Sequence, residues 1–99
     1  MDGPDEIIHQ STRLRIVAAL NALGAREMLE FAQLKAMLDM TDGNLATHLA
    51  ALERAAYVEI NKDFVGKRPR TRVALTGKGR RALRNHVAFL RSVLEGVQS

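Results

Sequence analysis

The residues of this 99-residue chain that are best suited to chemistry lie in the tract from Thr41 to Leu75. One set is small and polar, with the spacing of one helix face: Asn44, Thr47 and His48. The other set is cationic and follows later in the tract: Lys67, Arg68 and Arg70. Side-chain amides and hydroxyls can hydrogen-bond base edges, and arginine and lysine bind phosphate oxygens. The tract therefore has the chemistry of a polyanion-binding site.

Both sets also have a simpler interpretation. Polar residues at this spacing are typical of the solvated side of any amphipathic helix, and Arg68-Pro69-Arg70 is also typical of a turn that serves solubility. Pro69 stiffens the turn, however, and flanking arginines suit a phosphate or a narrow minor groove. Because the two sets adjoin each other, we favour binding over solvation.

The charge distribution points the same way. The net charge is +4, but one segment holds most of the cations against a single acid, Asp63. Its basic residues are Lys62, Lys67, Arg68, Arg70, Arg72, Lys78, Arg80, Arg81 and Arg84. Such a block in an otherwise acidic chain is typical of a polyanion site, whereas the alternative is a solvated charged face. Arg80, Arg81 and Arg84 could contact a DNA backbone, pair with acids of a partner subunit or simply be exposed.

Composition excludes several classes of function. The chain has no cysteine, which rules out disulfides and thiolate chemistry. It has no phosphate-binding glycine motif, no H-x-x-x-H pair and no paired carboxylates, so we expect neither an enzyme nor a cofactor. His9, His48 and His86 are too scattered to indicate a metal site. Without a long apolar run or a signal peptide, we expect no membrane span and a cytoplasmic location, on the nucleoid when bound to DNA.

Periodicity predicts the elements that position these residues within a single domain, 1–99. After a short helical turn at Pro4, Ser11 is expected to cap a helix that runs to about Leu23. A short extended piece at 28–30 follows. Two further helices joined at Asp39-Met40 form a helix-turn-helix over residues 31–56, and Thr41 caps the second of them. Its apolar stripe is Leu45, Leu49, Leu52 and Ala56.

Period-two alternation then predicts a hairpin over residues 58–75. Its strands are expected to join at Gly66-Lys67-Arg68-Pro69-Arg70, and Asn61-Lys62-Asp63 is a candidate bulge. Thr76 caps a last helix over 77–97. The fold class is therefore mainly α with a small β-hairpin that must pack on a three-helix core.

These segments together resemble the winged-helix fold of bacterial and archaeal transcriptional regulators. The resemblance is carried by HQSTRLRIV (9–17), TDGNLATHLAALERAAYVEI (41–60) and GKRPRTRVALTGKGRRAL (66–83), and it covers nearly the whole chain. The chain is most similar to small MarR-like or ArsR-like members, known as the winged-helix DNA-binding domain family. The resemblance implies a winged helix-turn-helix with a two-stranded wing and a C-terminal dimerisation helix.

By this resemblance the helix from Thr41 to Ala56 is the recognition helix, and the wing reaches the backbone or minor groove of double-stranded DNA. The predicted DNA-binding residues are Asp42, Gly43, Asn44, Thr47, His48, Lys67, Arg68, Arg70 and Arg72. Relatives usually have glycine at the position of Ala56. Here the helix either exits differently or holds a left-handed alanine that costs roughly 1 kcal/mol. An effector pocket formed by extra terminal helices and a cysteine-based metal sensor are not expected.

The apolar face of the last helix is broader than a small core requires. We therefore predict a homodimer that presents two recognition helices about 34 Å apart. The predicted dimer-interface residues are Leu83, Val87, Phe89, Leu90, Leu94 and Val97. The functional hypothesis is a non-enzymatic regulator of transcription. Its alternatives are a winged-helix protein-interaction module and a small-ligand-responsive MarR-like regulator.

Overall fold

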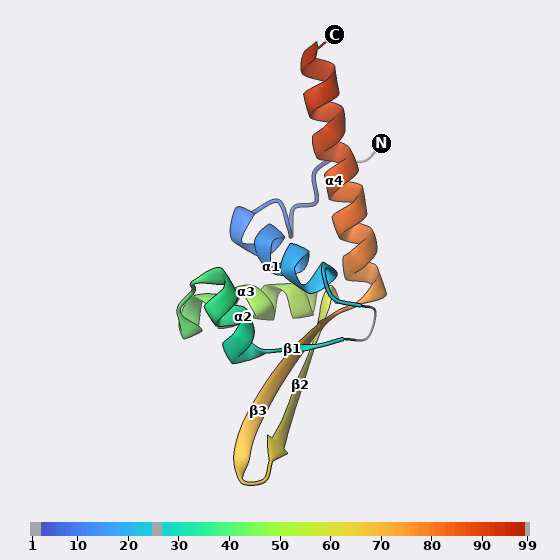
Figure 1. Cartoon of the computed structure of the whole chain (residues 1–99). Coiled ribbons are helices and arrows are strands. Elements are labelled where there is room, and N and C mark those ends of the chain that lie inside the picture. The colour runs from blue at the N-terminus through green and yellow to red at the C-terminus, as the bar shows by residue number, and fades with distance from the viewer. Residues whose placement is uncertain (1–2, 25–26, 99) are drawn as a thin grey trace.

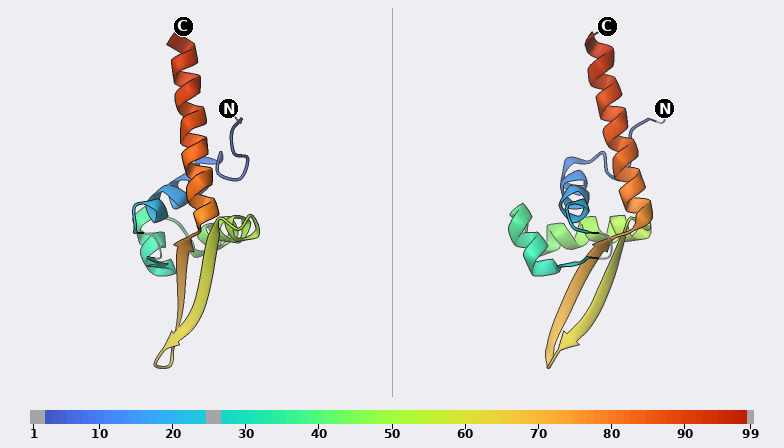
Figure 2. Two further views of the ribbon diagram at one scale, coloured as in Figure 1. Left: turned by 90° about the vertical axis from the view of Figure 1, so that its right-hand side faces the viewer. Right: turned by 45° about the vertical axis from the view of Figure 1, so that its right-hand side comes forward.

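The structure is a computed structural model, and it describes residues 3–24 and 27–98, with side chains to Gly96. Within these residues the elements are α1 (Ser11–Asn21), β1 (Leu29–Glu30), α2 (Phe31–Leu38), α3 (Asp42–Arg54), β2 (Val58–Val65), β3 (Arg68–Leu75) and α4 (Gly77–Gln98). Helices α1, α2 and α3 form the body of the molecule (Figure 1). The β2–β3 hairpin leaves this body in one direction and the far half of α4 leaves it in the opposite direction (Figure 2), which explains the extents of 59 × 25 × 21 Å.

The first helix differs from the sequence prediction at both ends. Gln10, not Ser11, is its N-cap, because the Gln10 side chain accepts a hydrogen bond from the Arg13 amide at 2.9 Å. The helix ends at Asn21, before the predicted end at Leu23. The cap is an ordinary right-handed Ala22 rather than a glycine.

The predicted helix-turn-helix is present in α2 and α3. Asp39 ends α2 in the left-handed conformation, with a φ of 53°. The hydroxyl of Thr41 accepts a hydrogen bond from the Asn44 amide at 3.2 Å, which confirms Thr41 as the N-cap of α3. One side of α3 is buried through Leu45, Leu49 and Leu52. The opposite side of the helix therefore faces solvent.

The end of α3 decides between the two alternatives at Ala56. The prediction that Ala56 continues the apolar stripe is wrong, because α3 ends at Arg54 and Ala56 is exposed with a φ of 63°. The Ala56 amide donates to the Glu53 carbonyl and the Tyr57 amide to the Leu52 carbonyl, both at 2.9 Å. These two bonds form a Schellman cap. Ala56 therefore adopts the conformation that glycine adopts most easily, at a cost of about 1 kcal/mol.

The wing is more regular than predicted. Strands β2 and β3 pair without interruption from Val58↔Leu75 to Val65↔Arg68, so the candidate bulge at 61–63 is absent. The joining loop is only Gly66-Lys67, and Arg68-Pro69-Arg70 lies in β3, not in the turn as predicted. A two-residue loop closes a hairpin tightly when its first residue has positive φ, and the φ of Gly66 is 63°.

A third strand joins the wing at its base. The short extended piece, β1, pairs with β3 through Leu29↔Val73, and the strand order is β1-β3-β2. The predicted two-stranded sheet is therefore three-stranded. This added strand attaches the hairpin to the start of α2, which positions the wing relative to the helix-turn-helix.

Helix α4 is fixed to the body at its first turns only. The Thr76 hydroxyl accepts from the Gly79 amide at 2.9 Å and confirms the predicted N-cap. A Cβ at Gly79 would lie 2.3 Å from the carbonyl oxygen of Tyr57, so this close contact requires glycine. Ala82 and Leu83 are buried in the core, while Val93 and Leu94 farther along α4 are exposed. None of the described helices combines the length and apolar character needed to span a membrane.

Candidate nucleic-acid interface

The solvent side of α3 carries most of the predicted recognition residues. Those that are exposed on it are Asp42, Gly43, Asn44 and Thr47. A Cβ built on Gly43 would meet no other atom within 4 Å. Packing within the folded chain therefore does not require glycine at this position. Glycine is also a poor helix former, so helix stability does not favour it there either.

Three of the predicted recognition residues have side-chain partners within the chain. The Asp42 carboxylate forms an ion pair with Lys35 at 2.8 Å. The Thr47 hydroxyl donates to the Gly43 carbonyl at 2.9 Å, a bond that leaves the oxygen free to accept another. The half-buried His48 accepts at Nδ1 from Nε of Arg13 at 3.1 Å. In its neutral form His48 therefore carries its proton on Nε2. Sequence reasoning missed Arg13, which lies on α1 and holds this ring in place.

Side chains alternate across the wing and give it two faces. The inner face carries Lys62, Phe64, Pro69 and Thr71. The outer face carries Asp63, Val65, Arg68, Arg70 and Arg72. The inner face looks toward α3, because Lys62, Thr71 and Ile60 line a groove of about 340 Å³ together with residues of α3.

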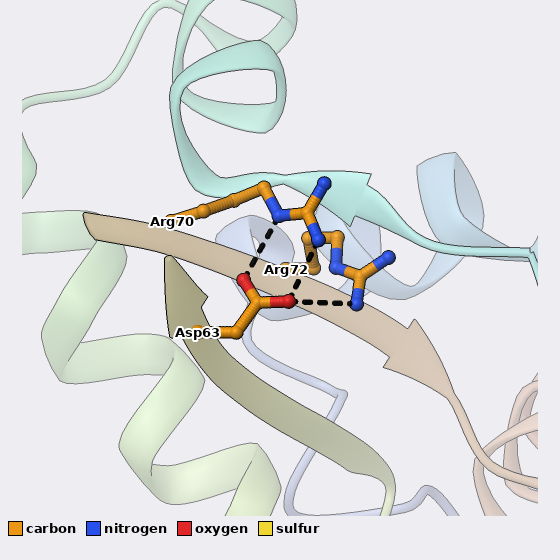
Figure 3. Close-up of polar contacts among 3 residues, drawn as sticks. All are labelled: Asp63, Arg70 and Arg72. Atoms are coloured by element: carbon orange, nitrogen blue, oxygen red, sulfur yellow. Dashed lines mark hydrogen bonds and ion pairs between the residues drawn. The ribbon is translucent and has the colours of Figure 1, made fainter. Parts of the chain in front are cut away.

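An ion-pair cluster occupies the outer face (Figure 3). The Asp63 carboxylate accepts from Nε of Arg70 at 2.9 Å and from its Nη2 at 2.7 Å, and from Nη2 of Arg72 at 3.2 Å. The hydrogen bonds from Arg70, and the charges of both arginines, lower the pKa of Asp63. Two predicted DNA-binding residues, Arg70 and Arg72, are thus already paired within the wing. Asp63 lies opposite Arg70 because the loop has only two residues. The longer loop predicted from the sequence does not place these two residues opposite each other.

Lys67 lies in the turn, as predicted, and Arg68 follows it as the first residue of β3. Both are exposed. The tip of the wing therefore carries two exposed cations, whereas Arg70 and Arg72 nearer the body form ion pairs with Asp63. Farther along the basic block, Arg80 donates to the side-chain oxygen of Asn21 at 3.0 Å and so joins α4 to α1.

The predicted dimer-interface residues divide between the core and the surface. Leu83 is 8% exposed and belongs to the core of its own chain, so it offers no surface to a second copy. Val87 is half-buried against that core. Phe89 and Leu90 are half-buried, and Leu94 is 66% exposed. The side chain of Val97 lies outside the described residues. The free apolar surface lies on the far half of α4.

Two histidines that are distant in the sequence come into contact. The rings of His9 and His86 meet edge to face, with their centroids 5.5 Å apart, and His86 is 1% exposed. Nδ1 of His86 accepts from the Asp5 amide at 3.3 Å. Burial, followed by the nearby charge of His9, lowers the pKa of His86. Among the described side chains no group of three potential metal ligands gathers. The histidine contact joins the N-terminal segment to α4.

Comparisons with known proteins agree with this geometry. A family model described as a winged helix DNA-binding domain matches residues 12–94. An uncharacterised protein of Methanocaldococcus jannaschii is 39% identical over 82 residues, which are 83% of this chain and 86% of that protein. A solved transcriptional regulator homologue of Pyrococcus horikoshii OT3 is 32% identical, with a TM-score of 0.82 over 94% of this chain and 89% of its own.

More distant structures share the fold. They are the zinc-responsive MarR family member ZitR of Lactococcus lactis and a PadR family transcriptional regulator of Eggerthella lenta. ZitR is 18% identical, with a TM-score of 0.66 over 99% of this chain and 65% of its own. The PadR protein is 24% identical, with a TM-score of 0.65 over 88% of this chain and 82% of its own. The predicted winged-helix fold is confirmed, and the chain belongs to the winged-helix DNA-binding domain family of transcriptional regulators, which are not enzymes.

Proposed function

We propose that this protein is a homodimeric transcriptional regulator that binds specific sites in duplex DNA. Helix α3 enters the major groove, and the wing tip binds the phosphate backbone or the minor groove. The observation that carries the proposal is the pairing of an exposed polar helix face with a cationic hairpin tip. The face consists of Asp42, Gly43, Asn44 and Thr47, and the tip carries Lys67 and Arg68. The regulator works in the cytoplasm, on the nucleoid when bound.

The contacts within α3 support different tasks for its residues. Asn44 is exposed, and an asparagine side chain can form two hydrogen bonds to adenine. Thr47 keeps an acceptor available, and its methyl group can contact a thymine methyl. His48 is held by Arg13 through Nδ1, which leaves Nε2–H to donate a hydrogen bond. Gly43 has open space around it, which supports a close approach of the helix start to DNA.

The far half of α4 supports dimer formation. Phe89 and Leu90 are half-buried, and the apolar residues that follow them on α4 are exposed, with Val93 47% and Leu94 66% exposed. Large apolar side chains on a projecting helix are typical of an interface between subunits. A two-fold dimer through this face would place two copies of α3 on one side of a duplex, about one helical turn apart.

Selection of bound duplexes from a random pool, with the purified full chain, tests this function. A palindromic enriched site, bound at low salt and progressively released as salt rises, is the expected result. An unenriched pool with measurable affinity would leave only non-specific DNA binding. Absence of binding even at low salt would overturn the proposal in favour of a protein-interaction module.

A further inference from the structure

The wing carries a large apolar side chain outside the hydrophobic core. Phe64 is 69% exposed and lies directly opposite Pro69 near the tip of the hairpin. The core contacts of β2 and β3 are near the body, at Val58, Val73 and Leu75. A phenylalanine that is 69% exposed gains little stability from burial, since its stabilising effect depends on the area removed from water. Its position beside exposed lysines near the wing tip makes it a candidate for contact with a ligand.

Strand alternation places Phe64 on the inner face of the wing, the face that looks toward α3. Along this face, Ile60, Lys62 and Thr71 line the groove beside α3, and Phe64 and Pro69 follow toward the tip. A ligand that contacts the exposed side of α3 and the wing together would meet this face first. The outer face is directed away from α3.

The charge around Phe64 selects the kind of ligand. Lys62 on the same face and Lys67 in the adjoining loop are exposed cations. Asp63, the acid nearest to Phe64 in the sequence, lies on the outer face and is paired with Arg70 and Arg72. The inner face near the tip is thus apolar and cationic. This combination fits duplex DNA, in which phosphates border a minor groove lined by sugars and base edges.

We propose that Phe64, backed by Pro69, makes an apolar contact in the DNA minor groove, while Lys62 and Lys67 bind the phosphates on either side. This inference rests on the proposed DNA-binding function and adds a contact to it. The Asp63–Arg70–Arg72 cluster acts from the outer face as a positioning device. It joins β2 to β3 on the face opposite to the one on which strand alternation places Phe64.

Val65 offers a matched control. It adjoins Phe64 and is 48% exposed, but it points from the outer face. In fluorescence anisotropy with the selected duplex, Phe64→Ala should lower affinity about tenfold, because the apolar contact is lost. Val65→Ala should change it less than about twofold. The salt slope should stay the same for Phe64→Ala and fall by about one for Lys67→Ala, because only the lysine releases a counterion.

The outcomes separate this inference from the proposed function. A wild-type chain that binds no duplex would overturn both. A wild-type chain that binds, with Phe64→Ala and Val65→Ala equal to it, would overturn the Phe64 contact alone. The contact would also be overturned if Phe64→Ala altered the oligomeric mass without altering DNA affinity, since Phe64 would then contact another copy of the chain.

A spectroscopic variant gives a direct readout. The chain has no tryptophan, so Phe64→Trp introduces a single indole fluorophore. Its emission should change on addition of the duplex, because the ring leaves water for the groove. Val65→Trp should keep the emission of a solvated indole. Unchanged emission of the Phe64→Trp protein at saturating duplex, with affinity retained, would contradict the contact.

Discussion

The two ends of this elongated molecule differ in the charge of the surface that they expose. The wing tip carries the exposed cations Lys67 and Arg68 beside the exposed Phe64, whereas the far half of α4 carries exposed apolar residues such as Leu94. Both ends are built in the same way. The near half of the hairpin and the near half of α4 supply core residues, and the far halves extend beyond the core. Core packing therefore places few demands on either far half.

This difference shows how a small domain can separate two binding tasks. A cationic tip gains affinity from a polyanion and is weakened by salt. An apolar helix face gains affinity from burial and is much less affected by salt. If the two ends are independent devices, substitutions in the wing or α3 should leave the oligomeric mass unchanged. Substitutions on the far half of α4 should then lower DNA affinity only through loss of the dimer. The following predictions test this independence, beginning with the largest expected effect.

The largest effect is expected from Leu94→Glu at the apolar end. A buried charge without a partner is costly, so the dimer should dissociate and DNA affinity should fall about a hundredfold as the second half-site contact is lost. Sedimentation equilibrium and anisotropy measure the two effects. Glu95→Ala, an exposed neighbouring residue, should leave both unchanged. A Leu94→Glu protein that stays dimeric would exclude this face as the interface.

At the polar end, Asn44→Ala should relax sequence preference. Loss of a bidentate contact should reduce discrimination at one base-pair position by roughly 1–3 kcal/mol. Competition between the selected duplex and single-base variants measures this change. The oligomeric mass should not alter. Equal discrimination by variant and wild type would remove Asn44 from base recognition.

Arg68→Ala should weaken binding to all sequences alike, by a few-fold to about tenfold, and should flatten the salt slope by about one. Arg91→Ala is the matched control, since it removes one exposed arginine from the other end of the molecule. Anisotropy titrations between low and moderate salt compare the two proteins. Identical slopes for both variants would contradict the assignment of DNA binding to the wing tip.

Ala56→Gly tests the joint between α3 and the wing. Since Ala56 has a φ of 63°, glycine should raise the free energy of unfolding by about 0.5–1 kcal/mol. Ala55 is the right-handed C-cap of α3, with a φ of −79°, so Ala55→Gly should instead lower the free energy of unfolding. Urea unfolding at constant m-value measures both changes. A loss of stability in Ala56→Gly would contradict the strain argument.

Buried His86 on α4 should make the free energy of unfolding depend on pH. Its folded pKa lies below the ordinary value of 6.5, so the folded state favours the neutral ring. The stability that this ring contributes is complete above pH 6.5 and declines as pH falls through the folded pKa. Urea unfolding between pH 8 and pH 5 should show the decline. It should diminish in His86→Gln and persist in His48→Gln. Equal profiles for all three proteins would contradict the assignment.

Several features could be predicted because they depend on neighbours in the sequence. Thr41 and Thr76 cap their helices through amides three residues later, and Asp39 ends α2 at a local turn. The apolar period of α3 identified its buried side for the same reason. From these local signals follow the order of the elements and the exposed face on which the proposed recognition residues lie.

Other features depend on register and packing, and these were missed. A loop of two residues rather than five places Asp63 opposite Arg70, so two of the predicted DNA-binding arginines, Arg70 and Arg72, form ion pairs within the wing. Leu83 belongs to the same periodic stripe as Leu94, yet only the position of the body along α4 decides that one is core and the other is surface. Periodicity alone does not contain that position.

The sequence by itself determined the winged-helix plan, the helix caps and the separation of a basic segment from an apolar last helix, because each of these arises from local spacing or composition. The tertiary structure alone decided which cations remain free, which leucines remain exposed, that His9 meets His86 and that Phe64 faces the side of α3. Those outcomes require distant segments to meet, and the meeting depends on strand register and on the packing of α4 against the body.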